Sequence, residues 1–126
     1  IWFVQFVHYP LFRTIPPASF VRYEREHVRR TGWIVAPTML LELLTGCLLV
    51  LFWWQRPETS RLVAAMGLLG IIWLSTFLIQ VPLHGRLSRA FDQEAVDRLA
   101  RSNWTRTSAW SLRVLILLPT VLEQLT

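Results

Sequence analysis

Long apolar runs dominate this chain of 126 residues, and they predict helices that cross a membrane. Three runs contain almost no charge: 33–54 has one acid, 62–84 has neither acid nor arginine, and 104–122 has two arginines. Each run can cross a hydrocarbon core of about 30 Å, because a helix rises about 1.5 Å per residue. The opening run, 1–12, would reach only about 18 Å and begins without methionine, so we expect it to be the second half of a first spanning helix.

These runs predict an all-α fold with a single domain over residues 1–126. We expect an integral membrane bundle of four transmembrane helices, at 1–12, 33–54, 62–84 and 104–122. Composition agrees, because 53% of the residues are hydrophobic and the mean hydropathy of +0.40 exceeds that of a soluble domain of this length. The single cysteine, Cys47, excludes an intrachain disulfide.

Two connections carry amphipathic patterns that predict short interfacial helices. Residues 92–101 begin with Asp92, which can cap a helix, and continue with an apolar stripe. Residues 19–30 place aromatic side chains on one face and charges around it. We expect both segments to lie along the inner membrane surface. The turn 55–61 is short and polar, which predicts that the second and third spans are antiparallel neighbours.

The arginines predict how the chain is oriented in the membrane. All thirteen basic residues are arginine; five lie between the first and second spans and four between the third and fourth, whereas only Arg56 and Arg61 lie between the second and third. By the positive-inside rule, both long connections are cytoplasmic and both termini face outward. The net charge of +5 therefore indicates topology and attraction to the inner leaflet. No nucleic-acid-reading motif accompanies the arginines, so we exclude nucleic acid as a partner.

Two charges lie inside predicted spans at matching depth. Glu42 stands nine residues after Trp33 and Arg113 nine residues after Trp104, which places both about 13 Å from the cytoplasmic face. An unpaired charge there costs at least about 2.5 to 3.5 kcal/mol, and pairing is the usual remedy. We therefore predict a contact between Glu42 and Arg113. It serves either as a structural bridge or as a charge that binds substrate or moves a proton.

A second set of polar residues falls near the cytoplasmic ends of the spans. Gln5 and His8 share one helix face, and Gln80 and His84 share another, so the two halves of the chain resemble a repeated hairpin. Other polar groups approach from the connections. The predicted polar cluster comprises Gln5, His8, Glu24, His27, Glu42, Gln80, His84, Asn103 and Arg113.

Part of this cluster has the residue types of a metal site. Glu24 and His27 form the ExxH spacing that di-iron bundles use, and with His8 and His84 they make a candidate ligand set. Paired histidines can also hold haem or hydrogen-bond a quinone. The spacing occurs once rather than twice, and a charged helix face explains it equally well. A metal, haem or quinone is therefore one alternative, and no cofactor is the default expectation.

The stretches VHYPLF, QVPLH and NWTRTSAWSLR, together with the four-helix length, resemble an uncharacterised group of small bacterial membrane proteins. That group is similar in layout to anthrone-oxygenase-like domains of unknown function. The resemblance implies a compact four-helix protein of the bacterial inner (cytoplasmic) membrane, with cofactor-independent or metal-dependent oxygenase relatives. It implies no substrate and no catalytic residues.

Three classes of function fit these patterns. The first is an accessory subunit of a larger respiratory or photosynthetic membrane complex, which a small, apolar chain without a complete catalytic motif favours. The second is a membrane-embedded oxidoreductase or oxygenase that uses the polar cluster on a lipophilic substrate. The third is a small dimeric transporter with Glu42 as its proton site, which Arg113 at equal depth disfavours. The partners expected are the lipid bilayer and other membrane subunits or a second copy.

Overall fold

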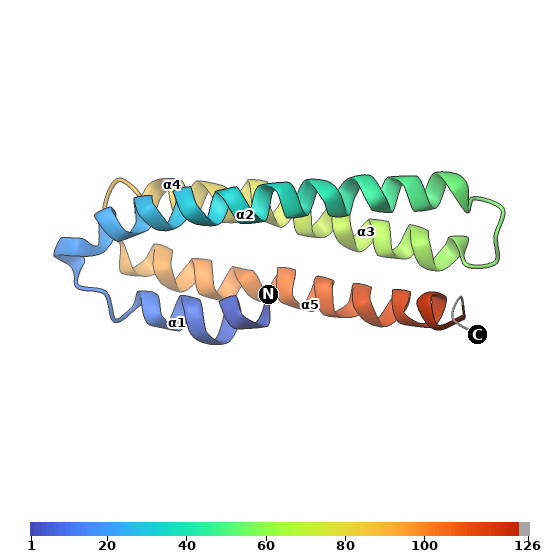
Figure 1. Cartoon of the computed structure of the whole chain (residues 1–126). Helices are drawn as coiled ribbons and strands as arrows, with labels where there is room; N and C mark the ends of the chain where they lie inside the picture. Colours follow the sequence, from blue (N-terminus) through green and yellow to red (C-terminus); the bar gives the residue numbers. More distant parts are fainter. Residues whose placement is uncertain (124–126) are drawn as a thin grey trace.

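The chain forms four helical rods that lie side by side in the computed structural model, which describes residues 1–123 (Figure 1). The first rod comprises the π-helical turn Val4–His8 and α1 (Tyr9–Phe12), and the second is α2 (Pro17–Phe52). The third joins α3 (Thr59–Ser75), a π-helical segment (Thr76–Gln80) and α4 (Val81–Leu87), and the fourth is α5 (Gln93–Glu123). The predicted all-helical architecture is therefore confirmed, with no strand within residues 1–123.

The two segments predicted as separate interfacial helices are parts of longer helices. Residues 19–30 belong to α2 and residues 93–101 belong to α5. Pro16 and Pro17 start α2, and Asp92 accepts a hydrogen bond from the Ala95 amide at the start of α5, as the capping prediction expected. No proline follows either start before the apolar run begins, so nothing interrupts the helical backbone. The expectation of two separate segments was wrong for that reason.

Two π-helical turns interrupt the regular geometry, and each ends two residues before a proline. One spans Val4–His8 and precedes Pro10; the other spans Thr76–Gln80 and precedes Pro82. Proline lacks a backbone N–H and its ring crowds the carbonyl of the preceding turn, so the helix widens there. The widened turns contain Gln5 and Gln80, and both amides are buried. The pattern of a glutamine followed by a proline, which occurs in both halves of the sequence, thus coincides with a π-helical turn in both halves of the structure.

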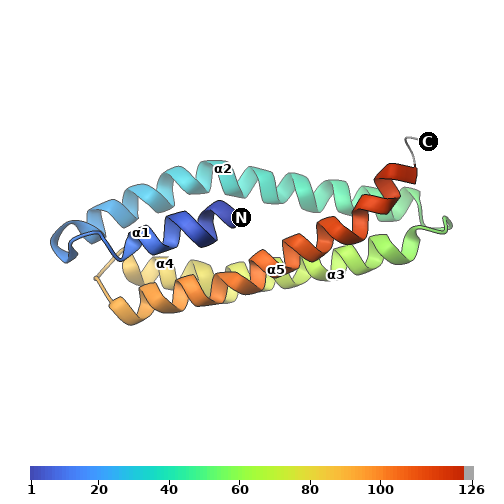
Figure 2. The ribbon, with the colours of Figure 1, turned by 90° about the horizontal axis from the view of Figure 1, so that it is seen from below.

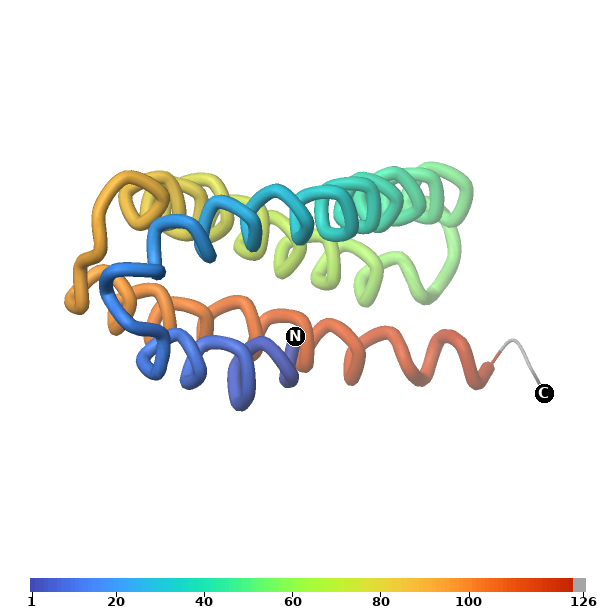
Figure 3. Tube along the Cα trace, turned by 60° about the vertical axis from the view of Figure 1, so that its left-hand side comes forward, coloured from blue at the N-terminus to red at the C-terminus, as the bar shows by residue number. Residues whose placement is uncertain are grey.

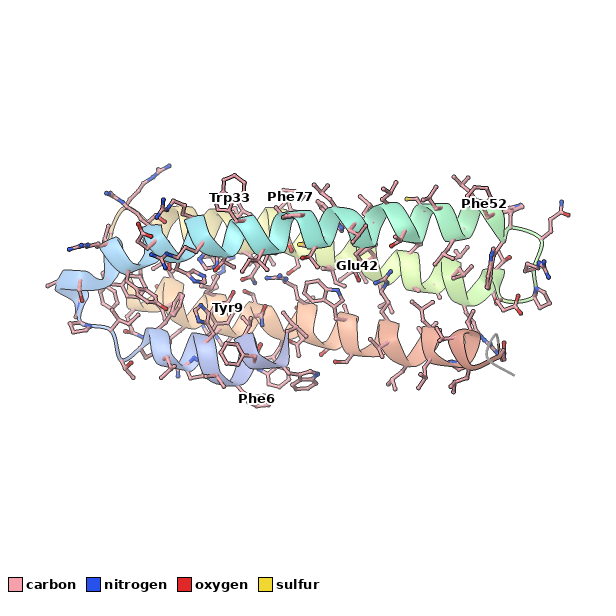
Figure 4. All side chains as sticks on the ribbon, viewed as in Figure 1. Phe6, Tyr9, Trp33, Glu42, Phe52 and Phe77 are labelled. Atoms are coloured by element: carbon pink, nitrogen blue, oxygen red, sulfur yellow. The ribbon has the colours of Figure 1, made fainter. Side chains whose placement is uncertain are left out.

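Apolar side chains cover the outside of the bundle, while several polar ones lie inside. Trp33 and Phe52 are 79% and 80% exposed and point away from the other helices, whereas Glu42 points inward (Figure 4). Two helices of the described chain, Pro17–Phe52 and Thr59–Leu87, are long and apolar enough to cross a membrane. An apolar exterior around a polar interior is compatible with a membrane protein.

Buried apolar side chains form two clusters, one at the arginine-rich end of the bundle and one further along its length. At the arginine-rich end, Phe12 and Phe20 pack with Leu87 and Leu99 from the third and fourth rods. Further along, Leu69 and Ile72 of α3 pack with Met39 of α2 and Ala109 of α5. The polar residues described below lie between and beside these two clusters.

The first rod is short, so it covers only part of α5. Figures 2 and 3 show it alongside the half of α5 that begins near residue 93, with the N-terminus near the middle of the molecule. Beyond that level, a groove of about 700 Å³ runs between α2 and α5, with Ile1 and Val4 at its near end and Val114 at its far end. The bundle therefore has four helices at one end and an open corner towards the other.

Candidate functional site

Three histidines and one glutamate converge at the arginine-rich end of the bundle, from three different rods. His8 lies at the end of the first π-helical turn, Glu24 and His27 lie one turn apart on α2, and His84 lies on α4. The Nε2 atoms of His8 and His27 are 3.4 Å apart, and the His84 Nδ1 atom lies 2.5 Å from Glu24 Oε1. The ring centres of His27 and His84 are 5.4 Å apart. The predicted convergence of these residues is present, and we call these four residues the histidine cluster.

Glu24 is the most deeply enclosed charged residue of the cluster. Its side chain is 0% exposed, and its Oε2 atom has no hydrogen-bond partner among the described residues. A buried carboxylate oxygen normally has a donor, because desolvation without one costs about 1 to 3 kcal/mol. One oxygen of Glu24 is thus available to a ligand, water or proton.

His27 differs from an ordinary surface histidine. It belongs to residues 17–32 of α2, which lie outside the predicted span, and its Nδ1 atom lies 3.1 Å from the Thr31 hydroxyl. Burial lowers the pKa of His27 to about 4, and electrostatic interaction with the neighbouring His8 and His84 rings adds to that effect. His27 is therefore neutral near pH 7 and keeps an unprotonated ring nitrogen.

A buried amide network adjoins the cluster. Asn103 Nδ2 donates to Gln5 Oε1 over 2.9 Å, and Gln5 Nε2 donates to the Ala100 carbonyl over 3.2 Å. On the other side, the Tyr9 hydroxyl donates to Gln80 Oε1 over 3.1 Å, and Gln80 Nε2 donates to the Ser102 hydroxyl. Both glutamines thus tie the π-helical turns to the same stretch of α5, which fixes the rods that carry His8 and His84.

The predicted contact between Glu42 and Arg113 is formed, in the interior of the adjoining part of the bundle. Arg113 Nη1 donates to Glu42 Oε1, and Arg113 Nε donates to the Ala65 carbonyl over 3.2 Å. Trp110 Nε1 also donates to both Glu42 oxygens, at 3.1 and 3.2 Å. The carboxylate is therefore fully engaged by fixed donors, which favours a bridge between α2, α3 and α5.

Arg106 is a buried cation that the sequence did not single out. Its side chain lies four residues before Trp110 on the same face of α5, with the guanidinium carbon 5.2 Å from the Trp110 ring centre. Arg106 Nη1 donates weakly to Asn103 Oδ1 over 3.4 Å. Among residues 1–123, no carboxylate forms an ion pair with it. Its position inside an apolar run was visible in the sequence, but its burial required the packing of α5.

The structure thus separates the predicted polar cluster into three groups. His8, Glu24, His27 and His84 form the histidine cluster; Gln5, Gln80 and Asn103 form the amide network; and Glu42 and Arg113 form an ion pair further along. The sequence missed Tyr9, Ser102, Arg106, Thr107 and Trp110 as partners of these groups. Hydroxyl and indole donors such as these have no distinctive spacing, because their partners come from other helices.

The candidate metal ligands meet in pairs. His8 Nε2 faces His27 Nε2, while His84 Nδ1 contacts Glu24 Oε1. Within the described chain, no group of three or more histidine, cysteine, aspartate or glutamate side chains is arranged to hold a metal ion. The arrangement supports proton exchange among neighbouring nitrogen and oxygen atoms, whereas a bound metal stays a prediction from the residue types.

No protein-family model, curated protein or solved structure matches this chain.

Proposed function

We propose that this protein is a membrane-embedded enzyme of the oxidoreductase or oxygenase class, in which the histidine cluster acts as a general base on a lipophilic substrate. The observation that carries the proposal is the fully buried Glu24 carboxylate, with one oxygen held by His84 and the other without a hydrogen-bond partner among residues 1–123. A buried acid with an oxygen that no described residue engages is typical of a proton acceptor at a functional site.

The neighbouring histidines support the same role. His27 stays neutral near pH 7 because of burial, and its Nε2 atom lies 3.4 Å from that of His8. A proton taken up by one nitrogen can therefore move to the next without leaving the cluster. The resemblance to anthrone-oxygenase-like domains implies a related chemistry and is consistent with this proposal.

The substrate class that fits is a lipophilic hydroquinone or related hydroxyarene. In such a reaction the hydroquinone loses two hydroxyl protons and two electrons to become a quinone, and dioxygen takes up both to become hydrogen peroxide. The cluster would accept the first hydroxyl proton and so raise the electron density of the ring. The dioxygen is the oxidant, and the chain's own residues supply only the base.

We place the protein in the bacterial inner membrane as a multi-pass protein of four transmembrane helices, with the arginine-rich connections in the cytoplasm and both termini outward. The support is the positive-inside rule together with the apolar exterior of the rods. The histidine cluster would then lie near the cytoplasmic interface.

The test is oxygen uptake by the purified protein in mild detergent, with a reduced naphthoquinone as the substrate. Glu24→Gln should lower kcat about 100-fold or more, because positioned general bases contribute about 10² to 10⁴ in rate. The control is Glu26→Gln, which alters an exposed carboxylate one half-turn away. Equal rates for the two variants, or no uptake above that of control membranes, would contradict the proposal. Metal analysis of the same sample decides between a metal-dependent and a cofactor-independent reaction.

A second candidate is the accessory-subunit role, which one specific observation favours. Ala64, Gly67 and Gly70 are exposed on α3, and a Cβ added at either glycine would meet no atom of the described residues within 4 Å. A strip of small side chains on the outside permits close approach by a helix of another chain. Migration with a larger complex in native gels of its own membranes would support this role, and a stable monomer there would count against it.

A further inference from the structure

The open groove between α2 and α5 contains a buried positive charge that the proposed enzyme function does not use. Arg106 lines this groove and is only 8% exposed, so its guanidinium is removed from bulk solvent. Its Nε atom has no hydrogen-bond partner among the residues described. An uncompensated buried cation is costly, and buried charges are normally paired. The groove is therefore built around a cation that lacks its anion.

Among the described charged residues at the groove, Arg106 is the residue whose charge is not balanced by an opposite charge. Glu42 also lines the groove, but it is engaged by Arg113 and by the Trp110 indole. Arg113 does not line the groove, but it balances the Glu42 carboxylate, so the charge of Arg106 is left without a counter-charge among the described residues. Trp110 stacks against the guanidinium and holds it in place. One monoanionic group would complete the site.

The rest of the groove is apolar and elongated. Val35 and Met39 of α2 face Val114 of α5 across it. From Arg106 to Val114 is eight residues, or about 12 Å along the helix. The groove has a volume of about 700 Å³. Small-molecule sites typically have volumes of about 300 to 1,000 Å³. A flexible hydrocarbon chain fits these walls, with its polar end at Arg106.

We propose that this groove binds a single-chain amphiphile with a carboxylate head, such as a long-chain fatty acid, with Arg106 as the anchor of the carboxylate. The planar guanidinium matches a carboxylate, and the missing partner carries a single negative charge. The apolar walls take the chain. This site is separate from the histidine cluster and does not depend on the enzyme function proposed above.

The experiment measures binding of radiolabelled palmitate to the whole chain in phosphatidylcholine nanodiscs, with hexadecanol as an uncharged competitor of equal length. Wild-type protein should bind palmitate about tenfold or more tightly than hexadecanol, because a charged hydrogen bond is worth that factor or more. Arg106→Gln should remove this preference and leave hexadecanol affinity unchanged. Arg106→Lys should retain part of it. Arg101→Gln, an exposed arginine on the same helix, is the matched control.

A second pair of variants tests whether the hydrocarbon chain of the ligand lies in the groove. Thr38→Trp should fill the groove and weaken both palmitate and hexadecanol, whereas Leu40→Trp, on α2 but outside the groove, should weaken neither. Equal affinity of the wild-type protein for palmitate and hexadecanol would overturn the proposal, even if Arg106→Gln failed to fold. Stronger competition by a short-chain phosphatidylglycerol than by palmitate would also overturn it, in favour of a phospholipid.

Discussion

The Oε1 atom of Glu24 lies 2.5 Å from the His84 Nδ1 atom, which joins α2 to α4 through a fully buried carboxylate. The two residues are 60 positions apart in the chain. Because Glu24 has no other hydrogen-bond partner in the described chain, this single contact fixes the carboxylate in the histidine cluster. The proposed general base depends on this contact, which also contributes to the stability of this end of the bundle.

Removal of either partner of this contact should destabilise the bundle. We expect Glu24→Leu and His84→Leu each to lower the free energy of unfolding by about 1 to 3 kcal/mol, since each leaves a buried polar group without its partner. The double variant should lose less than the sum of the two, because the unpaired group is then absent. Reversible unfolding in mixed micelles measures all three. Strict additivity would show that the contact does not contribute.

The stability of the protein should depend on pH through His27. The pKa of His27 is lowered from an ordinary 6.5 to about 4, so the folded state binds fewer protons than the unfolded state between these values. Stability should therefore fall as the pH falls from about 6.5 towards 4 and change no further through this group below that. His8 and His84 lie beside the His27 ring, and Glu24 contacts His84.

The measurement is the thermal midpoint between pH 7.5 and pH 4.5 for the wild type and for His27→Gln. The variant should show a shallower loss of stability across this window, because its side chain does not titrate. Parallel profiles for the two proteins would contradict the assignment to His27.

The ion pair between Glu42 and Arg113 should show strong coupling. Glu42→Gln and Arg113→Gln each leave a largely buried charge without its partner, and such losses typically cost about 3 to 5 kcal/mol. We expect the double variant to be more stable than either single variant. The control is Arg61 with Glu123, an exposed pair at the far end of the bundle, whose coupling should be about 0 to 1 kcal/mol. A coupling as small as that of the control would refute a structural bridge.

Two glycines should respond differently to larger side chains. A Cβ at Gly46 would meet Met66 Sδ at 2.6 Å and Arg113 Nη2 at 3.7 Å. Gly46→Ala requires only a shift of the flexible Met66, whereas Gly46→Leu should displace Arg113 and destabilise the protein by about 1 to 3 kcal/mol. The added methyl group of Gly67→Ala would contact no atom of the described residues within 4 Å. This substitution should therefore stabilise α3 by up to about 1 kcal/mol. Thermal unfolding of the three variants compares them directly.

The proposed topology can be tested by cysteine labelling in intact cells. Cys47 is first replaced by serine, and Gln55→Cys or Arg89→Cys is then introduced at an exposed position. A membrane-impermeant maleimide should label residue 55 from outside, and residue 89 only after the membrane is permeabilised. The opposite pattern would show that the orientation is the reverse of the one proposed. Equal labelling of both positions in intact cells would exclude a membrane span between them.

Several features of the fold were predictable because they depend on local pattern. The apolar runs predicted the helices, and the polar turn after Trp54 predicted the antiparallel neighbours α2 and α3. Matching depth predicted the contact of Glu42 with Arg113. The extent of α2 and α5 was not predicted, because the amphipathic starts were interpreted as separate helices. The composition changes from amphipathic to apolar within each of these helices, but such a change does not by itself end a helix.

The sequence by itself determined the helical class, the polar residue types and the level of each along its helix, because these follow from hydropathy and from a constant rise per residue. Only the tertiary structure decided which of those residues meet. Rotation of each rod brought the His84 nitrogen to the Glu24 carboxylate, and it buried Arg106 beside Trp110 in a groove. Such rotations are set by side-chain packing between helices distant in sequence, which no local pattern encodes.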